Sequence, residues 1–250
     1  MAWEAKSQKP QGIIGIAHVE VVSTFWALGF KKLIHPPVLY SFSRGVPIDV
    51  SRNYFANECL KRKLKWVLMY DSDIIPQEDG LMKLLEASDK YGYKVIGGLY
   101  WKRHPVMHPS MWISAEKVGV KTDKGKYLPL YQFYCKQCRQ GILNARAAIQ
   151  HRDATGHEVV RSWTTGDIVE VDVIGMGFTL IHREVFEAIE PPYFYYEHGR
   201  KEGGVSEDFY FCEKAREAGF KIAVHTGVLC KHEVKSYIDP ETGELNFYEV

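Results

Sequence analysis

Short apolar runs alternate with longer segments of helical periodicity along the first hundred residues. The runs that predict strands cover residues 12–17, 38–42, 66–70 and 95–100. The segments that predict helices cover residues 21–28, 47–63 and 76–91, with Gly29 and Gly92 as two of the helix ends. This alternation predicts an α/β fold, with a Rossmann-type, mostly parallel sheet flanked by helices.

The alternation stops near residue 100 and resumes near residue 167. Further strands are predicted at 168–173, 178–181 and 221–224, and further helices at 183–189 and 206–218. We therefore expect three parts: a first half at 11–130, a small insertion at 131–160 and a second half at 161–250.

Two carboxylates follow the apolar run 66–70 directly, in the sequence Asp71-Ser72-Asp73. Residues two apart in an extended chain point the same way, so Asp71 and Asp73 are expected to converge on one ion. Ligands bind at the carboxyl ends of strands in open α/β sheets, and carboxylate oxygens favour Mg²⁺ or Mn²⁺. The alternative is a turn in which these side chains cap backbone groups.

Polar and basic residues suited to a phosphate occur near the same predicted edge. They are Ser43, Arg44, Arg52, Asn53, Lys102 and Arg103. Arg52 and Asn53 fall in the predicted first turn of a helix, where backbone N–H groups and the helix dipole favour anions. For any one of these residues, a side chain that simply faces solvent is the alternative.

The insertion contains four potential metal ligands. Cys135 and Cys138 form a Cys-x-x-Cys pair, and His151 and His157 follow at a spacing typical of Cys2His2 zinc sites. The alternative is two reduced thiols and two surface imidazoles, but four such ligands rarely fall into this spacing by chance. Gly156 and the lack of a basic reading helix argue against base recognition by this segment.

The helix at 206–218 carries a carboxylate on its predicted inner face. Ser206 suits the N-cap, and Asp208 shares a face with Cys212 and Ala215. Asp208 is therefore expected to point into a cleft, and Glu207 to face solvent in the favourable field of the helix dipole. A capping role alone is the alternative for both acids.

Taken together, these motifs resemble those of nucleotide-sugar-dependent glycosyltransferases of the GT-A fold. The motifs are the Asp-x-Asp after an apolar strand, the run 175–181 before a helix, Ser206-Glu207-Asp208 at the start of the next helix, and the late His232. The run 98–103 is similar to one in phage and metagenomic family 2-like glycosyltransferases.

The resemblance implies roles for several residues. Asp71, Asp73 and His232 would hold Mn²⁺ or Mg²⁺ on the donor diphosphate, and Asp208 would be the general base. It implies a nucleoside diphosphate sugar as donor, with a UDP-sugar favoured, bound by residues 11–130, and an acceptor bound by residues 161–250. A hydroxymethylated base in phage DNA is the acceptor that the phage likeness indicates.

Composition narrows the alternatives. The chain of 250 residues is 46% hydrophobic, enough for a large core, and its 32 basic and 31 acidic residues give no sign of a polyanion partner. No signal peptide or membrane span is evident and the five cysteines are odd in number, so we expect a cytoplasmic protein. A zinc-finger nucleic-acid-binding module and a Mg²⁺-dependent nucleotidyltransferase or phosphotransferase stay open as alternatives.

Overall fold

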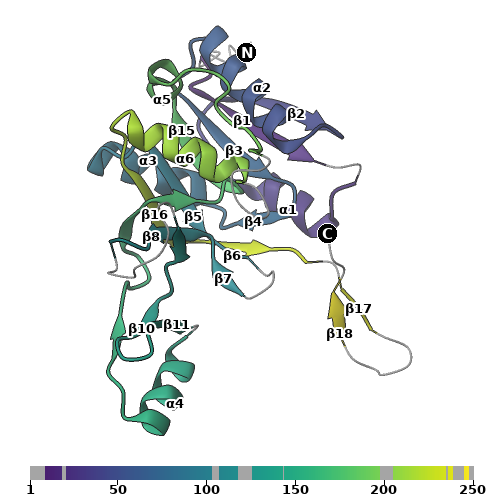
Figure 1. Cartoon of the computed structure of the whole chain (residues 1–250). Coiled ribbons are helices and arrows are strands. Elements are labelled where there is room, and N and C mark those ends of the chain that lie inside the picture. Colours follow the sequence, from purple (N-terminus) through teal and green to yellow (C-terminus); the bar gives the residue numbers. More distant parts are fainter. Residues whose placement is uncertain are drawn as a thin grey trace.

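The computed structural model describes most of the chain as a mixed α/β protein built around one large sheet (Figure 1). The described residues are 9–18, 21–102, 107–117, 126–142, 144–197, 205–234, 236–238 and 245–247. Within these ranges, the structure contains no helix that is both long and apolar enough to cross a membrane.

The main sheet has the strand order β13-β16-β5-β15-β3-β1-β2, and β4 pairs with β16 beside it. Its strands are β1 Gly12–His18, β2 Val38–Arg44, β3 Trp66–Asp71, β4 Ile74–Pro76, β5 Val95–Leu99, β13 Ile168–Val171, β15 Phe178–His182 and β16 Ile222–His232. The strands β2, β1, β3, β5 and β16 run in one direction, as their pairings require. The N-terminal part of the sheet is thus parallel, as the alternation of strands and helices predicts.

The sheet differs from the prediction at β15. This strand lies between β3 and β5 and is antiparallel to both, and β13 is antiparallel to β16. Residues 178–181 are buried in an unbroken apolar run, and such a run marks a strand covered on both faces without recording its direction. The sequence therefore does not predict that the sheet combines parallel and antiparallel strands.

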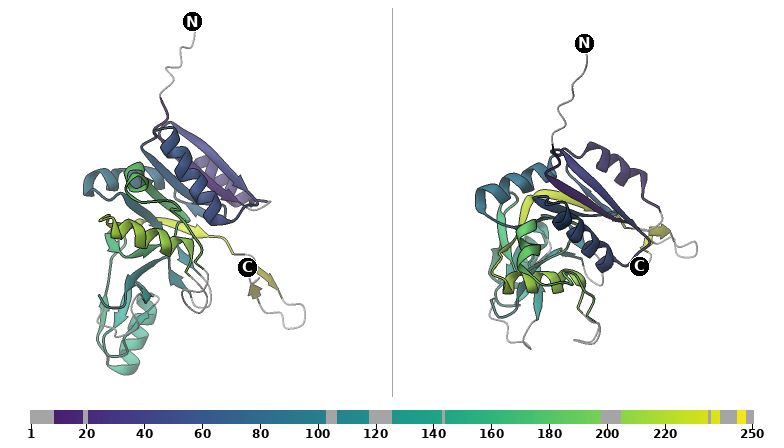
Figure 2. Two further views of the ribbon diagram at one scale, coloured as in Figure 1. Left: turned by 45° about the horizontal axis from the view of Figure 1, so that its top comes forward. Right: turned by 90° about the horizontal axis from the view of Figure 1, so that it is seen from above.

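Helices cover both faces of this sheet (Figure 2). They are α1 Thr24–Lys32, α2 Ile48–Lys61, α3 Gly80–Tyr91, α5 Arg183–Ala188 and α6 Glu207–Glu217. Alternate residues of β3 belong to opposite cores: Val67 and Met69 pack with residues of α2, α5 and α6, whereas Leu68 packs with residues of α1 and α3. This two-sided burial explains why β3 is apolar throughout until it reaches Asp71.

The first helix begins and ends later than the predicted range 21–28. Ser23 is its N-cap, and the Ser23 hydroxyl accepts a hydrogen bond from the Trp26 backbone N–H at 2.9 Å. Gly29 lies inside the helix instead of ending it. Capping by Ser23 satisfies a free N–H group of the first turn and sets the start of α1.

Two other helix starts bear on the candidate site. α3 begins at Gly80 instead of residue 76, because residues 74–76 pair with β16 as strand β4. α2 begins at Ile48, so Arg52 lies in its second turn and not in the predicted first turn. The side chain of Arg52 therefore points to neighbouring elements and not along the helix axis to an anion.

Smaller sheets extend from the main body. Residues 133–161 form a three-stranded sheet with one helix and its own small core, which hangs below the main sheet in Figure 1. Its elements are β10 Phe133–Cys135, β11 Gln140–Ile142, α4 Ala145–Thr155 and β12 Val159–Arg161. The remaining strands are β6 Trp101–Lys102, β7 His108–Pro109, β8 Met111–Ser114, β9 Tyr127–Pro129, β14 Val173–Ile174, β17 Ser236–Ile238 and β18 Leu245–Phe247.

Candidate functional site

The candidate site lies at the carboxyl end of β3, in the parallel part of the main sheet. β1 runs parallel to β2 on one side and to β3 on the other, so the carboxyl ends of these three strands lie at one edge of the sheet. Ligands of open α/β sheets bind outside the carboxyl ends of the strands. Asp71, the last residue of β3, stands opposite Ala17 at this edge.

A buried arginine contacts three carboxylates at this edge. Arg52 of α2 is 3% exposed, and its Nη2 donates to Asp71 Oδ2 at 3.1 Å. Its Nη1 donates to Glu207 Oε1 at 2.7 Å and to Asp208 Oδ1. Lys102 Nζ lies 3.8 Å from the other oxygen of Asp208. One guanidinium thus joins helix α2 to the end of β3 and to the start of α6.

The two neighbouring acids of α6 have opposite protonation tendencies. Burial raises the pKa of Glu207 to about 8, and the nearby Asp208 charge adds to this rise. Burial alone would also raise the pKa of Asp208, but Arg52 and Lys102 outweigh it and hold that pKa below its usual range. At neutral pH Asp208 is therefore ionised and Glu207 mostly protonated.

The prediction that Glu207 faces solvent is wrong. Glu207 is 5% exposed and, like Asp208, it points towards Arg52. The favourable dipole at a helix start explains an acid there but does not specify its partner. Here the partner comes from α2, far away in the chain. Ser206 does occupy the N-cap position of α6, although its side chain makes no capping hydrogen bond.

Asp73 and His232 lie side by side near the same edge. β16 pairs with β4 and so brings His232 Nε2 to 3.3 Å from Asp73 Oδ2. The other ring nitrogen, Nδ1, lies 2.9 Å from the Trp101 carbonyl oxygen, which makes Nδ1 the donor. In neutral His232 the lone pair of Nε2 then faces a carboxylate. Either a proton or a cation is needed between these two acceptors.

Asp71 and Asp73 do not converge in this structure. Asp71 turns to Arg52, whereas Asp73 turns to His232. β3 ends at Asp71, and the next two residues form a turn in which alternate side chains no longer share a direction. A cation shared by both aspartates would require Asp71 to leave Arg52.

Only some of the residues expected to bind phosphate lie near the Arg52 cluster. Ser43 lies at the end of β2, with its Oγ 2.8 Å from Ser51 Oγ, and Arg44 beside it is exposed. Lys102 lies next to Asp208, as described above. Arg103 lies outside the described residues.

Asn53 has a structural role that sequence reasoning missed. Its side-chain amide donates to the carbonyl oxygens of Asp49 and Phe194 and accepts from the backbone N–H groups of Tyr193 and Phe194. These bonds hold the aromatic segment 191–196 against α2 and leave the amide no free group for a phosphate. Tyr193 and Phe194 are buried, whereas Tyr195 and Tyr196 remain exposed.

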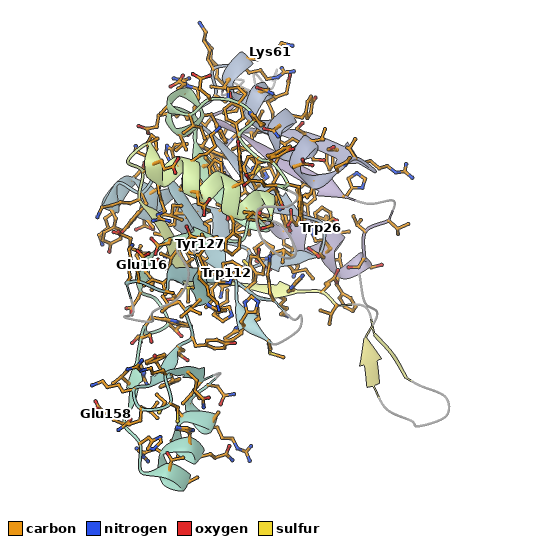
Figure 3. The ribbon with its side chains drawn as sticks, in the orientation of Figure 1. Trp26, Lys61, Trp112, Glu116, Tyr127 and Glu158 are labelled. Carbon is orange, nitrogen blue, oxygen red and sulfur yellow. The ribbon has the colours of Figure 1, made fainter. Side chains whose placement is uncertain are left out.

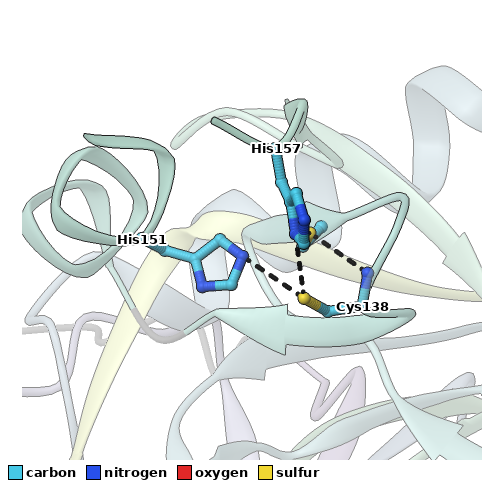
Figure 4. Close-up of side chains that lie close together, drawn as sticks. Cys138, His151 and His157 are labelled. Carbon is cyan, nitrogen blue, oxygen red and sulfur yellow. Dashed lines mark hydrogen bonds between the residues drawn. The ribbon is translucent and has the colours of Figure 1, made fainter. Parts of the chain in front are cut away.

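The four candidate ligands of the insertion do lie together (Figure 4). Cys138 Sγ is 3.6 Å from His151 Nε2 and 3.1 Å from His157 Nδ1, and Cys135 Sγ is 3.7 Å from His157 Nδ1. A tetrahedral zinc ion bound by sulfur and nitrogen places such atoms about 3.5 Å apart. Among the residues that the structure describes, this is the one set of at least three His, Cys, Asp or Glu side chains gathered closely enough for a single ion.

This group of Cys and His side chains lies apart from the Arg52 cluster. Glu158, next to His157, lies in the insertion and well away from Trp26 in Figure 3, and the Trp26 indole Nε1 donates to the Asp71 carbonyl oxygen at 3.0 Å. The two candidate sites are therefore independent.

The fold resembles a known structure over nearly its full length. The chain is similar to A197 from STIV, with a TM-score of 0.52 and 18% identity over 96% of this chain and 95% of that chain. It is also similar to a crystal structure of GalNAc-T7 with UDP, GalNAc and Mn²⁺, with a TM-score of 0.42 and 13% identity over 78% of this chain and 32% of that chain. No protein-family model matches the sequence, and no curated protein matches it.

We expect the purified protein to hold about one zinc ion per chain, and Cys135→Ser to lose it. Loss of the ion should also lower the melting temperature, because a structural metal stabilises the folded state. Cys59→Ala removes a buried thiol that is not part of this group and serves as the control. Elemental analysis after dialysis is the measurement, and full zinc content in Cys135→Ser would contradict the assignment.

We expect the free energy of unfolding to fall as the pH rises from about 4.5 to about 8, because folded Glu207 retains its proton over this range and unfolded Glu207 does not. The slope is at most about 1.4 kcal/mol per pH unit. Urea unfolding at several pH values measures it. Glu207→Gln should flatten the curve, whereas Glu217→Gln, on the exposed side of the same helix, should not. Equal slopes in all three proteins would show that Glu207 is ionised in the folded state.

Proposed function

We propose that this protein is a metal-dependent glycosyltransferase that moves a sugar from a nucleoside diphosphate donor, preferably a UDP-sugar, to a hydroxyl acceptor. The observation that carries the proposal is the Asp73–His232 pair at the carboxyl edge of the sheet. The likeness of Asp71-x-Asp73, Ser206-Glu207-Asp208 and His232 to GT-A glycosyltransferase motifs supports it.

The residues at this edge fit a divalent cation. Nδ1 of His232 is engaged by a backbone carbonyl, which is the arrangement that orients metal-binding histidines. Asp73 is exposed and supplies hard oxygen ligands suited to Mn²⁺ or Mg²⁺. Asp71 is close along the chain and would complete the set after a change of side-chain direction. When bound, the cation would stabilise negative charge on the leaving diphosphate.

Asp208 is the residue that we propose as general base. It is ionised at neutral pH, which is the state that can accept a proton from an acceptor hydroxyl. Its ion pairs with Arg52 and Lys102 lower its proton affinity. We therefore expect bound substrates to weaken at least one of these ion pairs before transfer.

The two alternatives receive less support. A two-metal nucleotidyltransferase needs further carboxylates free to bind metal, but Glu207 and Asp208 are bound to Arg52. A nucleic-acid-binding zinc module needs a basic surface, and the balanced charge of the chain gives it no support. For the same reason, a hydroxymethylated DNA base as acceptor stays a prediction from the phage likeness alone.

The decisive comparison is between Asp208→Asn and Asp73→Ala. Asp208→Asn should keep Mn²⁺-dependent stabilisation by a nucleoside diphosphate sugar, because the donor does not need the base. Transfer should fall by roughly 10²–10⁴-fold, as expected for loss of a general base. Thermal-shift assays with UDP-, GDP-, TDP- and CMP-sugars, and product formation with the donor that binds, measure the two effects.

Asp73→Ala should instead lose the Mn²⁺-dependent stabilisation itself. Donor binding that persists in EDTA, or in Asp73→Ala, would contradict the cation site. Normal turnover in folded Asp208→Asn would remove Asp208 as the base.

A further inference from the structure

We propose that Arg52 is a positioning residue that holds the Asp71 side chain and competes with a divalent cation for it. The inference rests on the proposed cation site at Asp71, Asp73 and His232. It assigns to Arg52 a control of cation binding, in place of the donor-phosphate contact that the sequence indicates.

The contacts of Asp71 support this competition. Both Asp71 carboxylate oxygens lie within hydrogen-bond distance of Arg52 Nη2, at 3.1 and 3.3 Å. The side chain of Asp71 is 27% exposed, so a cation can reach it from solvent, while that of Arg52 is only 4% exposed. A cation that binds these oxygens must therefore replace the guanidinium as their partner. Because Arg52 is buried, water cannot replace the hydrogen bonds that Nη2 then loses.

The remaining contacts of Arg52 show what would hold it after release. Nη1 is bound by Glu207 and Asp208, so the guanidinium stays anchored to α6 when Asp71 leaves. Its Nε is buried and has no partner among the described residues. Nη1 thus keeps two acceptors on α6 when Asp71 leaves, whereas Nη2 is the atom that Asp71 binds.

Arg52 also places a full positive charge close to the cation site. Coulomb repulsion in a partly buried site is much stronger than in water. Replacing Arg52 by a neutral side chain should therefore tighten cation binding, since it removes both the repulsion and the competitor. A purely structural arginine would have no such effect, because loss of packing does not increase metal affinity.

The test is Mn²⁺ affinity, measured by electron paramagnetic resonance of free Mn²⁺ with zinc-saturated protein. Arg52→Met should bind Mn²⁺ about tenfold more tightly than the wild type, and Arg52→Lys, which keeps the charge, should bind it with nearly wild-type affinity. Unchanged or weaker binding in folded Arg52→Met would overturn the inference.

Arg52→Met leaves the Asp71 and Asp208 carboxylates and the Glu207 carboxyl group without their partner, and such a change is strongly destabilising. The double variant Glu207→Gln with Asp208→Asn removes the Asp208 charge and the Glu207 carboxyl group, and the same double variant with Arg52→Met is compared with it. The triple variant should bind Mn²⁺ about tenfold more tightly than the double variant; equal affinities would overturn the inference. If none of these proteins binds Mn²⁺, the cation site itself fails and with it the proposed function, whereas Mn²⁺ binding that ignores Arg52 removes this inference alone.

Discussion

The Arg52 guanidinium lies almost entirely out of solvent and contacts carboxylates from two separate parts of the fold. Transfer of an ion from water to a protein interior costs several kcal/mol, which only close and well-oriented partners offset. The three acids exceed the charge of Arg52, and the proton held by Glu207 and the nearby Lys102 reduce the excess. The cluster is therefore stable only as a set, and it ties α2, β3 and α6 to one geometry.

Helix α2 also positions other parts of the site. Asn53, the next residue along the helix, binds the backbone of the segment that contains Tyr193 and Phe194. Phe194 in turn stacks on Phe211 of α6, with ring centroids 4.6 Å apart. The helix that supplies Arg52 thus also positions the aromatic segment beside α6. Helix α6 is thus contacted by Arg52 at Asp208 in its first turn and by Phe194 at Phe211 in its second.

Local patterns in the sequence predicted much of this structure. The apolar run before Asp71 marked a strand buried on both faces, and the spacing of Cys135, Cys138 and the two histidines marked side chains that do gather in the fold. The remaining features depend on contacts between distant segments, which local patterns do not predict. Arg52 meets Glu207 across 155 positions of the chain, and no periodicity within α2 or α6 encodes that meeting. The antiparallel direction of β15 between β3 and β5 also depends on tertiary contacts, because a run of apolar residues does not indicate the direction in which the strand pairs.

Our central claim is that a divalent cation binds at the carboxyl edge of β3. Locating the metal in a crystal tests this claim most directly. Crystals grown with Mn²⁺ and UDP, measured near the manganese absorption edge, would locate the ion by its anomalous scattering. We predict a manganese peak bonded to Asp73 and His232, at about 2.2 Å from the ligand atoms, with the Asp71 side chain turned away from Arg52 and towards the ion. A peak only among Cys135, Cys138, His151 and His157, or no peak at this edge, would contradict the claim.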